Sequence, residues 1–310
     1  MGIMRSGLLW ASRQQWIERQ FRQRRFARKA VRRFMPGEEL HDALDAAEGL
    51  KREGRPSIIT YLGENVTTVG EADQVRQDYE AMLGHIADRG LDTHVSVKLT
   101  HLGLDLNRDA ALAHLLVLTE AAGRHGNFMW VDMESSEYVD ITLDLYLQVR
   151  ARHPHIGVCV QAYLYRTADD LDKLLRRDAT IRLVKGAYRE PATAAFPKKA
   201  DVDENYFKLA ERLLEHAKRT TVQPHAIATH DATLVDRIRR RSGELDLSPN
   251  RWEVDMLYGI RADAQRQLVQ DGVTTRVLIS YGDAWFAWYM RRLAERPANV
   301  GFVIRSMFGG

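Results

Sequence analysis

Two cations lie inside an otherwise apolar run, at Arg182 and Lys185, in the segment 181–189. A cation in a buried strand is costly unless an anionic group meets it. The run loses its side-chain bulk at Gly186 and Ala187, where small residues would let a flat or phosphorylated ligand approach the backbone. The segment is therefore predicted to carry a cofactor.

Two further charged residues stand in apolar strands. Lys98 alternates with apolar neighbours, which predicts a buried side chain with a binding role. Asp132 is either part of the same site or only the partner of Lys98 or Arg182 in a structural ion pair. His230 ends another strand, and no second histidine or carboxylate stands at ligand spacing from it, which argues against a metal site.

An arginine pair, Arg291 and Arg292, follows an aromatic stretch over 285–289 that is too apolar for an open surface. Charge pairs on helices are usually solvated. Two guanidiniums beside an apolar surface are, however, suited to gripping a small carboxylate in bidentate fashion. The sequence therefore predicts that this pair binds an acid group.

Composition excludes several other functions. The chain has 310 residues, a net charge of +3 and one cysteine, Cys159. The charge is too small to indicate nucleic acid, and a single cysteine fits a reducing cytoplasm. We expect no membrane-spanning helix and no secretory signal. Gly-x-Ser-x-Gly and Gly-x-Gly-x-x-Gly are both missing, which disfavours nucleophilic hydrolysis and a Rossmann dinucleotide site.

The elements that would position these residues alternate eight times between an apolar strand and an amphipathic helix. This rhythm predicts an α/β fold, a (β/α)8 TIM-like barrel with some distortion, and a doubly wound open sheet is the alternative. The strands are expected at 57–64, 94–100, 127–134, 156–164, 181–188, 225–230, 251–258 and 274–281. The helices are expected near 71–89, 108–125, 138–151, 168–178, 201–219, 232–241, 262–271 and 283–296.

Alternation along the strands predicts which side chains face the barrel interior. The interior set is Ser96, Lys98, Thr100, Phe128, Trp130, Asp132, Glu134, Gly157, Cys159, Gln161, Tyr163, Arg182 and Val184. Lys185 has the opposite parity, so its strand is expected to end or bulge near Gly186. Polar groups thus gather at the carboxyl ends of the strands, where barrel enzymes keep their chemistry.

The chain divides into a helical arm over 1–52 and a barrel over 53–310. Residues 13–33 combine many cations with aromatic residues, and a second helix follows at about 38–52. The basic segment is expected to pack as a solvated helix on the barrel. A peripheral contact with an anionic membrane, at its inner face, is the alternative.

Seven motifs in this order resemble the proline dehydrogenase family, monofunctional bacterial type. They are YLGENV (61–66), VSVKLT (95–100), VDME (131–134), QAYL (161–164), RLVKGAY (182–188), ATH (228–230) and RRLAE (291–295). The resemblance implies a distorted (β/α)8 barrel that binds FAD. It also implies oxidation of L-proline to 1-pyrroline-5-carboxylate, with electrons passed on to a quinone.

The resemblance also implies roles for individual residues. Asp132 and Arg182 match the catalytic pair, while Lys98, Arg291 and Arg292 match the clamp on the substrate carboxylate. Glu64 matches a gating carboxylate that pairs with Arg291. Residues that match the substrate-ring pocket are Tyr188, Leu257, Leu278 and Trp288. Residues that match flavin contacts are Met133, Gln161, Arg182, Val184, Lys185, Gly186, Ala187, Thr229, His230 and Glu295.

The chain departs from the family pattern at three places. Leu278 and Trp288 stand where tyrosines are usual, and Asp255 stands where glutamine is common. The departures predict relaxed selectivity at the substrate ring, with 4-hydroxyproline as an alternative substrate. A Schiff-base aldolase that uses Lys185 is the rival enzyme class. A partner enzyme, 1-pyrroline-5-carboxylate dehydrogenase, is expected to take the product, and no nucleic-acid partner is expected.

Overall fold

Eight parallel strands close into a barrel in the computed structural model, which describes residues 31–286 and 288–290. The strands are β1 (Ser57–Tyr61), β2 (Thr93–Val97), β3 (Met129–Val131), β4 (Ile156–Gln161), β5 (Thr180–Val184), β6 (His225–Ala228), β7 (Trp252–Leu257) and β8 (Thr275–Tyr281). Each strand pairs with its sequence neighbour, and β8 pairs with β1, with Ser57 opposite Val277. The predicted closed barrel is confirmed, and the open sheet is excluded.

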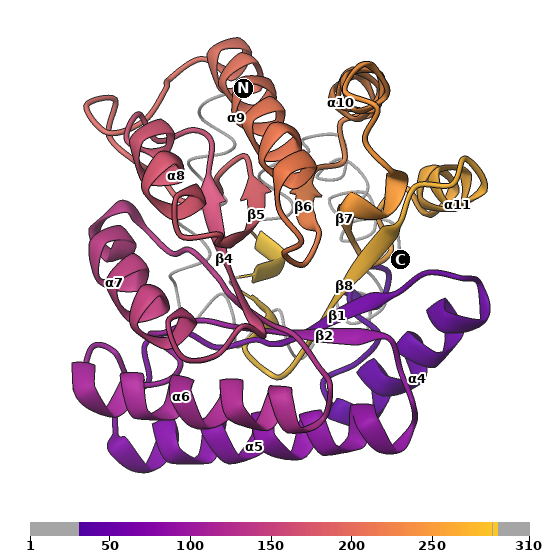
Figure 1. Ribbon diagram of the computed structural model, residues 1–310. Helices are drawn as coiled ribbons and strands as arrows, with labels where there is room; N and C mark the ends of the chain where they lie inside the picture. The colour runs from indigo at the N-terminus through magenta and orange to yellow at the C-terminus, as the bar shows by residue number, and fades with distance from the viewer. Residues whose placement is uncertain (1–30, 287, 291–310) are drawn as a thin grey trace, which may run out of the picture.

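Helices cover the outside of the barrel (Figure 1). They are α4 (Leu40–Arg52), α5 (Val69–Asp88), α6 (Arg108–Arg124), α7 (Val139–Arg150), α8 (Thr167–Leu175), α9 (Lys199–Arg219), α10 (Ala232–Glu244) and α11 (Ala262–Gln270), with short 3-10 turns at Ser136–Tyr138 and Pro249–Arg251. Several begin at side-chain caps: Thr68 and Glu71 form a capping box on α5, and Asn107 caps α6. None of the helices within the described residues is both long and apolar enough to cross a membrane.

All strands except β8 end earlier than the sequence predicts, and β8 ends at Tyr281 as predicted. β3 ends at Val131, where 134 was expected, and β5 ends at Val184, where 188 was expected. One ladder contact continues beyond β3, because the Asp132 N–H donates to the Val97 carbonyl at 2.8 Å. The apolar runs predict strands over their full length. In the structure the last residues of these runs lie outside the sheet, in the loops at the carboxyl end of the barrel.

The N-terminal part of the described chain packs on both the side and the carboxyl end of the barrel. Helix α4 lies against β1 and β8, and its buried residues belong to the main core cluster. Val31, Phe34 and Met35 form a second cluster with residues near the other end of the chain, Trp285, Phe286, Trp288, Tyr289 and Met290. At Gly259, which has φ +69°, a Cβ would lie 1.6 Å from the Arg33 carbonyl oxygen.

Two predictions lie wholly or partly outside the described residues. The basic segment 13–33 falls there except for its last three residues. The last predicted helix, 283–296, is described only in part, with helical backbone at 285, 286 and 288–290. The division into an arm and a barrel stays a prediction.

Candidate active site at the carboxyl end of the barrel

Arg182, on β5, lies in the barrel interior and is 3% exposed. Its Nε donates to Cys159 Sγ at 2.9 Å, and its Nη2 donates to Ser96 Oγ at 2.7 Å. The same Nη2 forms an ion pair with Asp132, and the guanidinium lies 5.2 Å from the Trp130 ring centroid. Side chains from β2, β3 and β4 thus hold one cation of β5, as the predicted interior parity requires.

Asp132 joins this cation to a second one. Its Oδ2 lies 3.6 Å from Lys98 Nζ, and its Oδ1 accepts a hydrogen bond from Ser96 Oγ at 2.8 Å. Burial alone would raise the pKa of Asp132, but Arg182 and Lys98 hold it below its usual value. Lys98, Asp132 and Arg182 are therefore brought together at the carboxyl end as a charged group with one excess positive charge.

A buried carboxyl group lies next to this set. Glu134 accepts hydrogen bonds from the Thr100 N–H at 3.1 Å and from Thr100 Oγ1 at 2.6 Å. Burial raises its pKa to about 7. Gln161, a predicted flavin contact, donates through Nε2 to the Glu134 carbonyl at 2.8 Å. The Met133 side chain, by contrast, packs in the main core cluster.

Lys185 is held by two carboxylates outside the barrel interior. Its Nζ lies 2.5 Å from Asp203 Oδ1 on α9 and 3.0 Å from Asp231 Oδ2, the residue that caps α10. Thr229 Oγ1 accepts from the Asp231 N–H at 3.2 Å, and His230 Nε2 accepts from the Leu257 N–H at 3.3 Å. Lys185 and Thr229 are therefore joined through Asp231 around the ends of β5 and β6, while His230 contacts the end of β7.

The turn after β5 depends on glycine at position 186. Gly186 has φ +116°, and a Cβ there would lie 2.2 Å from the Tyr163 ring. The glycine is thus required by the backbone and by Tyr163, whatever ligand lies above it. Val184 and Ala187 beside it are half-buried. Tyr188 OH donates to Glu64 Oε1 at 3.4 Å, which brings the predicted gate next to the predicted ring pocket.

The other predicted ring-pocket residues lie in two clusters. Leu278 packs in the barrel interior against a cluster that contains Ile58, Phe128 and Trp130. Leu257 and Trp288 lie in the cluster with Phe34 and Trp285. Arg291, Arg292 and Glu295 lie outside the described residues.

Residues that the sequence analysis did not assign complete the arrangement. Ser96 and Cys159 were expected in the interior, but their contacts with Arg182 and Asp132 were not foreseen. Asp203 and Asp231 were missed as partners of Lys185. For Asp231 a signal existed, because it directly follows the Ala-Thr-His motif at a strand end. No signal pointed to Asp203, which comes from a helix.

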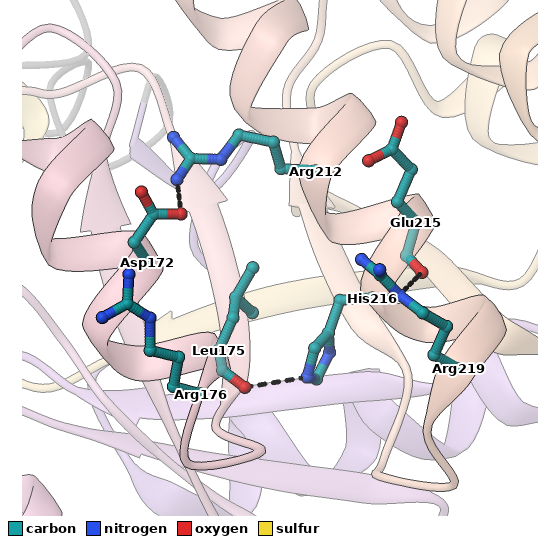
Figure 2. Close-up of a pocket in the computed structure, with 7 residues that line it drawn as sticks. All are labelled: Asp172, Leu175, Arg176, Arg212, Glu215, His216 and Arg219. Atoms are coloured by element: carbon teal, nitrogen blue, oxygen red, sulfur yellow. Dashed lines mark hydrogen bonds and ion pairs between the residues drawn. The ribbon is translucent and has the colours of Figure 1, made fainter.

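A cavity of about 320 Å³ lies elsewhere, on the outside of the barrel between α8 and α9. Figure 2 shows that Arg212 pairs with Asp172, and that His216 and Arg219 contact the Leu175 and Glu215 carbonyls. Among the described residues, no group of three or more histidine, cysteine or acidic side chains could hold a metal ion. Chemistry is therefore best sought around Arg182.

The fold and these side chains define a (β/α)8-barrel protein with a cationic site at the carboxyl ends of its strands, the end at which barrel enzymes bind substrates. The proline dehydrogenase family model matches residues 43–305. The chain belongs to the proline dehydrogenase family.

Individual relatives agree with this assignment. Proline dehydrogenase 1 of Bacillus subtilis subsp. natto is 36% identical over 280 residues, 90% of this chain and 91% of the relative. Proline dehydrogenase of Deinococcus radiodurans is 33% identical over 313 residues, 99% of each chain. A solved structure of proline utilization A from Bdellovibrio bacteriovorus, inactivated by N-propargylglycine, is 22% identical with a TM-score of 0.79. It matches over 86% of this chain but only 32% of its own length, and it supports the fold.

Proposed function

We propose that this chain is an FAD-dependent proline dehydrogenase that oxidises L-proline to 1-pyrroline-5-carboxylate. The observation that carries the proposal is the group formed by Lys98, Asp132 and Arg182 at the carboxyl end of the barrel. Proline is a zwitterion, and its carboxylate needs fixed cations that orient the ring for hydride transfer. Membership of the family and the names of the relatives support the same activity.

In this proposal each charged residue has its own task. Lys98 binds the substrate carboxylate, and Asp132 orients both Lys98 and Arg182 while balancing part of their charge. Arg291 and Arg292 complete the carboxylate clamp on the evidence of their motif, with Glu64 as the gate. The clamp fixes the ring, so that the reacting carbon keeps one position relative to the cofactor.

The residues present fit a flavin beside Arg182. Among the described residues, Arg182 Nη1 has no hydrogen-bond partner although it is buried, so it can donate to an acceptor on a ligand. When bound there, FAD would accept the hydride that leaves the proline ring. The other residues proposed to contact it are Met133, Gln161, Val184, Lys185, Gly186, Ala187, Thr229, His230 and Glu295.

The visible spectrum of the purified protein tests this proposal. We expect the absorption bands of an oxidised flavin, which bleach when L-proline is added without an electron acceptor. D-proline is the matched control, because its carboxylate projects from the opposite face of the ring. A colourless protein that cannot be reconstituted with FAD, or a flavin that L-proline does not bleach, would contradict the proposal.

Leu278 supports a second substrate, 4-hydroxyproline. It is partly buried against Ile58, Phe128 and Trp130, and it offers an apolar surface without a hydroxyl group at the proposed ring pocket. We expect Leu278→Tyr to raise the ratio of kcat/KM for proline over 4-hydroxyproline. An unchanged ratio would remove Leu278 as the determinant.

The aldolase alternative has less support. A Schiff base requires a free amine at Lys185, and both contacts with Asp203 and Asp231 would have to break before the amine could attack a carbonyl. Borohydride trapping of a carbonyl substrate on Lys185 would revive it.

For the acceptor and partners, we propose a quinone, peripheral contact of the basic segment with the inner face of the membrane, and 1-pyrroline-5-carboxylate dehydrogenase as the enzyme that takes the product. Binding of the full chain to anionic vesicles, compared with neutral ones, tests the membrane contact. Equal binding to both vesicle types, or none, would contradict it.

A further inference from the structure

Asp255 is a buried acid in the barrel interior that no role above uses. It lies on β7, is 4% exposed, and stands opposite Arg276 of β8 in the strand register. Neither of its carboxylate oxygens has a hydrogen-bond partner among the described residues. A buried acid without hydrogen bonds is costly in its ionised form.

Its nearest cation is Arg182, across a gap. Arg182 Nη1 lies 4.0 Å from Asp255 Oδ2, which is too long for a hydrogen bond. The other contacts of Arg182 are directed to Asp132, Ser96 and Cys159. The guanidinium therefore has one unbonded edge, and the unbonded carboxyl group lies beside that edge.

The second arginine that faces Asp255 is also committed to other carboxylates. Arg276 Nε donates to both oxygens of Glu253, at 3.0 and 3.1 Å, and Nη1 lies 3.0 Å from Asp92 Oδ1. Within residues 31–286 and 288–290, no cation is thus left for Asp255 alone. Burial and the nearby Glu253 raise the pKa of Asp255 to about 8, against the opposing effect of the two arginines.

The groups around Asp255 come from every element packed on it. The neighbouring strand β6 contributes only Ala228 in register. Behind the sheet, the Tyr206 hydroxyl on α9 donates to the Leu183 carbonyl at 3.0 Å. The titratable and charged groups that face Asp255 are Arg182 on β5, Glu253 on β7, Arg276 on β8 and, behind the sheet, Tyr206.

We propose that Asp255 is a positioning residue for Arg182: it holds a proton, and the presence of that proton sets how strongly Arg182 attracts an anion bound above it. When Asp255 is neutral, the positive charge of Arg182 attracts the bound anion without competition. When Asp255 is ionised, it attracts the guanidinium and repels the anion. Binding of an anion must in return favour the protonated acid, because the coupling is reciprocal. The inference rests on the proposed function in taking the anion to be a substrate carboxylate that Lys98 binds, and whose charge Arg182 attracts because Asp132 holds the two cations together.

The test uses the flavin-loaded full chain and tetrahydrofuran-2-carboxylate, whose ring oxygen replaces the proline nitrogen, so that the ligand itself does not titrate near neutral pH. Calorimetry gives its Kd from pH 6.5 to 9.5. For the wild type we expect a constant Kd below about pH 8, the pKa of Asp255, and a Kd that rises by up to about tenfold per pH unit above it.

Asp255→Asn imitates the protonated acid. We expect this variant to keep the low-pH affinity of the wild type, to within about twofold, and to show no rise in Kd up to pH 9.5. Asp271→Asn is the control, because it removes a carboxylate that pairs with Arg239 on the outside of the barrel; its Kd should rise with pH as in the wild type. An Asp255→Asn variant that keeps the rise, or that binds more weakly at every pH, would overturn the inference.

A second measurement does not depend on the variant. Wild-type binding at pH 8, measured in two buffers of different ionisation enthalpy, should show uptake of about half a proton per ligand. No uptake would overturn the inference even if the Asn variant failed to fold. If the carboxylate failed to bind at any pH while the flavin was present, the proposed function would fail as well, which separates the two outcomes.

Discussion

The two ends of the barrel interior each hold a buried arginine paired with a carboxylate, and they differ in how completely those groups are satisfied. At the amino end, Arg276 is bonded to Glu253, to Asp92 and to the Ser57 carbonyl. At the carboxyl end, Arg182 is bonded to Asp132, but one of its nitrogens has no hydrogen bond within the part of the chain that the structure describes.

The comparison separates a structural ion pair from one that can act on a ligand. Buried polar groups in folded proteins are almost always hydrogen-bonded, so a spare donor at Arg182 needs another explanation. A group that must bind something cannot be fully satisfied without it. The two ion pairs therefore predict different results when one member of each pair is removed.

The largest effect on stability is expected at the amino end. Arg276→Met leaves Glu253 buried without its partner, next to Asp255, and should lower the free energy of unfolding by about 3–5 kcal/mol. Urea unfolding measures the change. Arg239→Met removes a partly exposed pair with Asp271 and should change the same quantity by less than about 1 kcal/mol. Equal effects of the two variants would contradict the structural assignment.

The largest effect on activity is expected at the carboxyl end. Asp132→Asn should lower kcat/KM for L-proline by about 10²–10³, because Arg182 and Lys98 lose the group that orients them. Its stability loss should be smaller than that of Arg276→Met, since Asp255, 4.0 Å from Arg182, can ionise in its place. The comparison would be wrong if Asp132→Asn lowered the free energy of unfolding as much as Arg276→Met and still oxidised L-proline at the wild-type rate.

A pair of glycine substitutions tests the backbone at the two ends. Gly186→Ala, at the carboxyl end, meets the Tyr163 ring at 2.2 Å and should destabilise the protein by about 2–4 kcal/mol. Gly126→Ala, before β3, also has a positive φ but meets nothing within 4 Å, so about 1 kcal/mol is expected. Thermal unfolding of both variants isolates the clash, and similar losses would mean that Tyr163 moves aside easily.

The smallest effect is a pH dependence located at the amino end. His225 accepts from the Ile181 N–H at 3.1 Å and contacts His216 at 3.0 Å, and burial lowers its pKa to about 3. Because the unfolded chain then binds a proton that the folded chain excludes, stability should fall as the pH drops below about 6.5, by about 1.4 kcal/mol per pH unit.

Urea unfolding from pH 7 to 5 measures this loss, with His225→Gln as the comparison. The variant should show a shallower fall with pH than the wild type. If the free energy of unfolding falls equally steeply with pH in the wild type and the variant, the loss comes from the titration of other groups. Asp255 should act in the opposite direction, because its raised pKa means that the folded chain loses relative stability as the pH rises toward 8.

The barrel and the set of interior residues could be predicted from the sequence because both follow from local periodicity. Strand alternation places Ser96, Asp132, Cys159 and Arg182 on the same face of the sheet. When the sheet closes into a barrel, that face becomes the interior and the four side chains meet. The family motifs added roles for these residues, which stay proposals.

The rest depends on contacts between distant segments, which no local spacing contains. Lys185 was expected to meet a cofactor, and its carboxylate partners come from α9 and from the start of α10. The 4.0 Å distance between Arg182 Nη1 and Asp255 Oδ2 depends on how β5 and β7 are placed in the barrel, which the sequence pattern does not contain. Strand ends were misjudged because apolar runs continue past the last ladder contact.

The packing of Arg33 against Gly259 has a practical consequence for any study of the basic segment. A truncation that removes residues through 33 would take away Val31, which is 3% exposed, and the carbonyl that fills the space at Gly259. It would also uncover Trp285 and Leu257 close to the proposed ring pocket. A loss of turnover after this truncation would come from damaged packing and could be mistaken for a loss of membrane binding. An informative truncation therefore removes residues 1–30 and keeps Val31.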